Sequence, residues 1–139
     1  MPEGTAKAVL VLEGRVTGTR VLEARNGHDV LEISFSARGT FAGHEVEGSF
    51  TYEQEAISVN TFVGSGRAVL HTADGEGTLS LKATGATKRK EGATGLVWRV
   101  YAAVQSAAPT FAQWDGQLLD MTATIGDDQK ISLRAVPWT

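Results

Sequence analysis

Hydrophobic and polar residues alternate along most of this chain with a period of two, which is the side-chain period of a β-strand. The clearest case is a pair of segments, Thr61–Thr72 and Gly77–Ala86. In the first segment Phe62 and Leu70 share one face with glycine and alanine, and polar residues occupy most of the other face. An Asp-Gly turn joins the two segments, and this dipeptide between alternating runs is a strong hairpin signal. The pattern therefore predicts a central antiparallel hairpin.

The same alternation, or a short apolar run, predicts strands over the rest of the chain. Near the N-terminus, Gly14 and Gly18 interrupt the pattern and indicate either a turn or a bulge that bends one long strand. The chain is therefore expected to form eight or nine strands. The predicted segments are Lys7–Leu12, Thr17–Ala24, Asp29–Phe41, Glu45–Glu53, Thr61–Thr72, Gly77–Ala86, Thr94–Gln105, Gln117–Ile125 and Lys130–Val136.

These strands favour an all-β fold, a single closed antiparallel β-barrel that comprises residues 1–139. Most connections are short, and closure removes the exposed sheet edges that an open sheet would leave. The exception is Ser106–Gly116, which does not alternate. Pro109 is a suitable first residue for one helical turn, which would place Phe111 and Trp114 on the same side. We expect this segment to plug one end of the barrel, with a mobile lid as the alternative.

Composition and charge narrow the kinds of function that the chain can be expected to have. The chain has 139 residues, of which 42% are hydrophobic, so a single domain can build a core. There is no cysteine, and the formal net charge is −3 without a basic stripe. This argues against nucleic acid or a membrane surface as a partner. Residues 1–5 lack a positively charged leader region, so a cytoplasmic protein is expected.

No motif for a metal, a cofactor or a catalytic nucleophile is found. The three histidines are scattered without the spacing of a zinc site, so neither a metal nor a cofactor is expected. The basic run Lys88-Arg89-Lys90 is interpreted as a solvated turn. Arg99 and Tyr101 lie on the outward face of their strand, where they are ordinary surface or part of a subunit contact in a homo-oligomer.

The informative feature is the predicted inward face, which mixes large aromatic residues with glycine and alanine. Eight strands enclose either a filled core or space for one small ligand, so the small residues either let large ones interdigitate or leave a cavity. Tyr52 and Trp98 are the inward aromatic residues that carry a hydrogen-bond donor. The candidate ligand-binding residues are Phe35, Phe50, Tyr52, Phe62, Trp98 and Trp114.

From Gly39 to Gly126 the pattern resembles small uncharacterised bacterial proteins of the allene oxide cyclase-like, or calycin-like, barrel type. The resemblance covers about two-thirds of the chain and lies in glycine and turn signals. These are Gly43–Glu53, Gly64-Ser65-Gly66-Arg67, the turn Thr72-Ala73-Asp74-Gly75-Glu76, and Ser106–Gly116 before the last hairpin. It implies a small barrel with an apolar interior. In the named enzyme group such a cavity folds a reactive lipid into a ring, and no functional residue of that group is matched here.

Three functions remain open at this point. The leading hypothesis is a barrel that binds a hydrophobic small molecule in its interior. The second is a cyclase or isomerase that acts on an apolar substrate by holding one conformer, since positioning alone lowers a barrier substantially. The third is an oligomeric scaffold or partner-binding module with a solid barrel. An interior cavity of a few hundred Å3 would favour the first two, and a barrel filled by side chains would favour the third.

Overall fold

The computed structural model describes residues 7–139, and Met1–Thr5, on which the expectation about a leader rests, lie outside that range. The chain forms eight antiparallel strands and one short 3-10 helix. These are β1 (Leu10–Arg25), β2 (His28–Phe41), β3 (His44–Ala56), β4 (Thr61–Thr72), β5 (Thr78–Lys88), β6 (Leu96–Gln105), η1 (Pro109–Trp114), β7 (Leu118–Ile125) and β8 (Lys130–Pro137).

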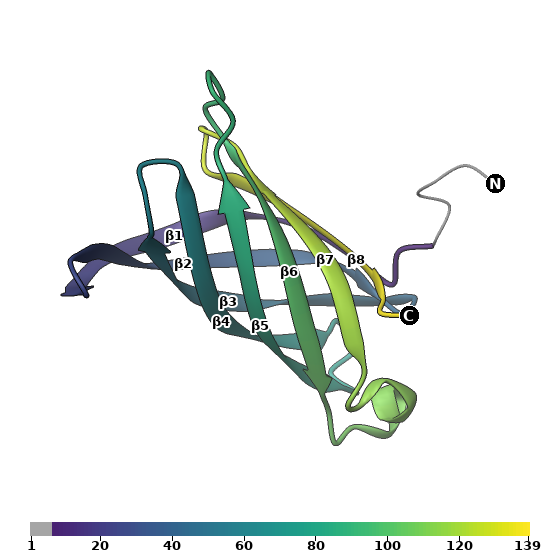
Figure 1. The fold of residues 1–139 in the computed structure, drawn as a ribbon. Coiled ribbons are helices and arrows are strands. Elements are labelled where there is room, and N and C mark those ends of the chain that lie inside the picture. Colours follow the sequence, from purple (N-terminus) through teal and green to yellow (C-terminus); the bar gives the residue numbers. More distant parts are fainter. Residues whose placement is uncertain (1–6) are drawn as a thin grey trace.

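The strands follow one another around a closed barrel in chain order, and β1 pairs with both β2 and β8 (Figure 1). The prediction of a closed antiparallel barrel is confirmed. Pairing of β1 with β8 extends only from Leu10 to Arg15, whereas pairing with β2 continues to Arg25. The hairpin of β1 and β2 therefore projects beyond β8 at one end of the barrel, which we call the open end (Figure 1).

A bulge in β1 explains why the chain forms eight strands rather than nine. The register of β1 against β2 shifts between Val16 and Gly18 and again between Leu22 and Arg25. A bulge adds a residue and bends a strand without ending it. The two N-terminal segments, Lys7–Leu12 and Thr17–Ala24, are therefore parts of one strand.

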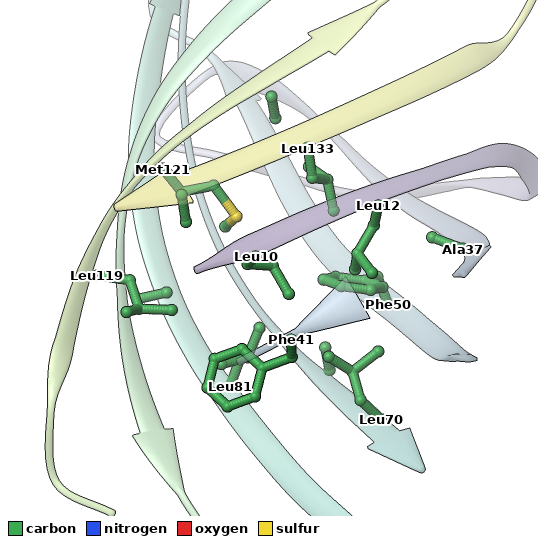
Figure 2. Close-up of a cluster of buried hydrophobic side chains, with 14 of the residues drawn as sticks. Leu10, Leu12, Ala37, Phe41, Phe50, Leu70, Leu81, Leu119, Met121 and Leu133 are labelled. Atoms are coloured by element: carbon green, nitrogen blue, oxygen red, sulfur yellow. The ribbon is translucent and has the colours of Figure 1, made fainter. Parts of the chain in front are cut away.

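The barrel interior is filled in the half that carries η1. Leucine and phenylalanine side chains from all sides of the sheet meet there, as Figure 2 shows for Leu10, Phe41, Leu70 and Leu119. Each of these four side chains is fully buried. The hydrophobic core is continuous from this half into the half that contains Phe35 and Trp98.

The segment between β6 and β7 closes this end as a plug. Phe111 in η1 is fully buried, and its ring packs edge-on against Phe41 with a centroid distance of 5.4 Å. Trp114 packs against the same Phe41 ring at 5.6 Å. Pro109 begins the helical turn, as the sequence predicts. Among residues 7–139, no helix has the length and apolar composition needed to cross a membrane.

Candidate functional site

The half of the barrel toward the open end contains a cavity of about 70 Å3. It exists because inward positions on β4 and β5 carry small residues where other strands carry large ones. Gly64, Gly66, Ala83 and Gly85 occupy these positions on two neighbouring strands. The facing side chains are mainly Phe35, Phe50, Tyr52, Trp98, Val100, Met121, Ile131 and Leu133. The wall is thus almost entirely apolar.

Two buried donors lie in this wall without an acceptor. Tyr52 and Trp98 contact each other edge-on, with ring centroids 5.7 Å apart. Neither Tyr52 Oη nor Trp98 Nε1 has a hydrogen-bond partner among residues 7–139, although both atoms are buried. Buried tyrosine and tryptophan donors are usually paired, because an unmade hydrogen bond leaves the desolvation penalty uncompensated. These donors therefore suit a ligand that brings an acceptor.

Burial raises the pKa of the Tyr52 phenol well above its ordinary value of about 10. We expect Tyr52 to stay protonated where an ordinary tyrosine ionises. Because the neutral form is favoured in the folded state, the free energy of unfolding should fall as pH rises above about 10. Absorbance at 295 nm during an alkaline titration measures the ionisation of the phenol.

The Tyr52→Phe variant is the control for that titration. It should lack the delayed absorbance step, because the buried phenol that produces this step is removed. A delayed step that persisted in the variant would contradict burial of the Tyr52 phenol.

The structure brings together four of the six candidate ligand-binding residues. Phe35, Phe50, Tyr52 and Trp98 line the cavity, and the first two rings stack with a centroid distance of 4.5 Å. Phe62 lies one inward position beyond Gly64, toward the open end.

Trp114 does not belong to this site. It packs in the plug against Phe41, at the end of the barrel opposite the cavity. The structure does not bring it together with Tyr52 and Trp98, because the sequence indicates an aromatic residue in a connection but not which barrel end that connection covers.

Arg89 is the residue that the sequence interpretation missed. The inward face of β5 runs through every second residue, from Leu79 to Thr87, and Arg89 continues the same register beyond the strand. It is half-buried rather than solvated, and its guanidinium carbon lies 5.8 Å from the Phe62 ring centroid. Extending the period of two by one more position would have found it.

The histidines do not form a site. His28 pairs with Glu55 at 2.7 Å, His71 contacts Thr78 at 3.1 Å, and His44 packs against the Phe111 ring. No group of three or more metal-ligating side chains occurs within residues 7–139.

The fold and the cavity define a small closed antiparallel β-barrel with a partly open, apolar interior site. No protein-family model matches this chain, and no curated protein matches it.

Three solved structures resemble it over nearly the whole chain. A conserved protein of unknown function from Rhodopseudomonas palustris is 12% identical, with 99% of each chain covered and a TM-score of 0.76. A protein of unknown function from Clostridium acetobutylicum is 10% identical, with 97% of this chain and 99% of that chain covered and a TM-score of 0.77. A β-barrel-like protein from Acinetobacter baumannii is 12% identical, with 99% of this chain and 97% of that chain covered and a TM-score of 0.75. At these identities the similarity establishes the fold alone.

Proposed function

We propose that this barrel binds a small, mainly apolar molecule in the cavity beside Tyr52 and Trp98. The observation that carries the proposal is the combination of an apolar pocket with two buried donors that lack acceptors. Ligand sites are typically apolar concavities in which a few polar groups fix orientation. An acceptor on the ligand would satisfy donors that have no partner among the described residues.

The size of the cavity restricts the ligand. At about 70 Å3 it is well below the 300–1,000 Å3 or so that encloses a drug-sized molecule. It is also below the engineered cavity of about 150 Å3 that admits benzene. We therefore expect a ligand that places only a few carbon atoms inside the barrel and extends toward the open end. A large lipid would need the walls to move.

Binding explains the site better than catalysis does. Cyclase or isomerase activity, as the resemblance to allene oxide cyclase-like barrels suggests, is the second proposal. Proton transfer at neutral pH works best with a group whose pKa lies near the operating pH. Among residues 7–139, the ionisable inward side chain of the cavity wall is Tyr52, whose pKa is raised away from that range. Arg67, which also borders the cavity, is exposed on the outward face of β4.

Filling the cavity tests the proposal. Ala83→Leu adds a branched chain to the inward face of β5, so we expect it to abolish binding of a neutral probe, hexanamide, while the protein stays folded. Ala86→Leu, at an exposed position on the outward face of the same strand, is the matched control and should leave binding unchanged. Ligand-observed NMR and isothermal calorimetry measure the binding.

Gly66 is not a suitable position for this test. A Cβ atom there would collide with the carbonyl oxygen of Thr51 on the neighbouring strand, so folding would be disturbed as well. If Ala83→Leu bound hexanamide as well as the wild type does, the interior site would be wrong.

A further inference from the structure

Arg89 directly follows β5 and continues the register of its inward face beyond the cavity, at the open end of the barrel. Two hydrogen bonds hold this part of the chain: the Arg89 amide donates to the carbonyl of Asn60 at 2.7 Å, and the Thr87 hydroxyl donates to the carbonyl of Val97 at 2.6 Å. The guanidinium lies over the Phe62 ring. Phe62 is two residues from Gly64 in the cavity wall, about 7 Å along the strand. The Arg89 guanidinium therefore lies about one inward position beyond the apolar pocket, toward the open end.

The guanidinium of Arg89 lacks an anionic partner among residues 7–139. Its Nε is buried without a hydrogen-bond acceptor, and it takes part in none of the ion pairs. Glu53 and Glu55, on the strand that pairs with β4, bind Arg25 at 2.9 Å and His28 at 2.7 Å instead. An arginine is charged at every physiological pH, and a buried charged donor that stays unpaired is costly.

The polar groups around the pocket thus form a set of donors. Tryptophan Nε1 and the guanidinium can only donate, and the protonated Tyr52 hydroxyl has a free hydrogen. Within the described range, residues 7–139, no carboxylate side chain lines the cavity. The complementary ligand is an acceptor with negative charge, and a carboxylate matches the planar fork of arginine.

Resting on the function proposed above, we infer that the ligand is a short apolar carboxylic acid. Its hydrocarbon part occupies the cavity beside Tyr52 and Trp98, and its carboxylate binds Arg89 at the open end. The neighbouring Lys88 and Lys90 side chains are exposed and add positive charge to this rim. The small cavity and the step of about 7 Å from its wall to the Phe62 ring under Arg89 favour a chain of a few carbons over a long fatty acid.

The experiment compares two probes of equal shape, hexanoate and hexanamide, by isothermal calorimetry at fixed low salt. The wild type should bind hexanoate about tenfold or more tightly than hexanamide, because a hydrogen bond to a charged group is stronger than a neutral one. Arg89→Gln should weaken hexanoate binding by about tenfold to hundredfold and leave hexanamide binding within about twofold.

Two further variants make the result specific to the guanidinium. Lys90→Gln removes one charge from the same turn and should change hexanoate affinity by less than about threefold, since an exposed charge is screened by water. Arg89→Lys keeps the charge but not the fork, and should fall between wild type and Arg89→Gln. Thermal unfolding of each variant verifies that it is folded.

The outcomes separate the two proposals. Equal binding of both probes to the wild type, or hexanoate binding that survives Arg89→Gln, overturns the carboxylate assignment while the interior site stands. Failure of both probes to bind the wild type overturns the interior site and the carboxylate assignment together.

Discussion

Replacing Phe111 by alanine is expected to lower the free energy of unfolding by about 3–5 kcal/mol, the range found when a buried phenylalanine is truncated. Phe111 is fully buried in η1, and its ring fills the space between Phe41 and Gly77. The surrounding strands are fixed by barrel hydrogen bonds, so they cannot close over the void that the variant leaves. Denaturation with urea measures the change.

The control for this variant is Val59→Ala, in the connection between β3 and β4. Val59 is 86% exposed, so its truncation should change stability by less than about 0.5 kcal/mol. A loss below about 1 kcal/mol for Phe111→Ala would mean that the segment behaves as a mobile lid rather than as a plug. Ligand entry through that end would then have to be reconsidered.

Adding a single methyl group at Gly48 is expected to lower the free energy of unfolding almost as much as Phe111→Ala does. Gly48 lies on the inward face of β3, and a Cβ there would come within 2.9 Å of the Leu70 Cα on β4, and closer still to the carbonyl oxygen of Val69. Backbone atoms cannot rotate away as a flexible side chain can. We expect Gly48→Ala to destabilise the fold by about 3 kcal/mol, the upper part of the usual range for overpacking.

Gly18→Ala is the matched control, because it adds the same methyl group to another strand glycine. No atom of the part of the chain that the structure describes lies within 4 Å of a Cβ at Gly18, and the φ of Gly18 is not positive. We expect a change of less than about 1 kcal/mol, and a small stabilisation is possible because alanine restricts the unfolded chain. Equal stability of Gly48→Ala and the wild type in thermal unfolding would show that β3 and β4 can move apart at no cost.

The glycine prediction has a general basis in the barrel geometry. Gly14 and Gly39 have the same surroundings as Gly48. A Cβ atom at either residue would collide with the backbone of an adjacent strand. Strongly coiled strands approach closely at the corners of a small barrel, and glycine permits this. Gly64 and Gly85 also approach the backbone of an adjacent strand, and they line the cavity as well.

The sequence by itself determined the strands, the turns and the inward face. Alternation with a period of two follows from the β-strand backbone, and each turn depends on residues close in sequence, so both can be recognised locally. Accordingly, the face that carries Phe35, Tyr52 and Trp98 could be assigned without the structure. The helical turn at Pro109 could be assigned for the same reason.

The tertiary structure alone decided what depends on distances between strands. The shift at Val16 merges two segments into one strand, because register is a property of a pair of strands and not of one sequence segment. The cavity size depends on side chains from seven strands meeting across the barrel, so no local pattern gives its volume. Neither the barrel end that Trp114 covers nor the burial of Arg89 can be read from the sequence, because their surroundings come from distant parts of the chain. An interior site is defined by which side chains face one another across the barrel, and only closure of the sheet establishes that.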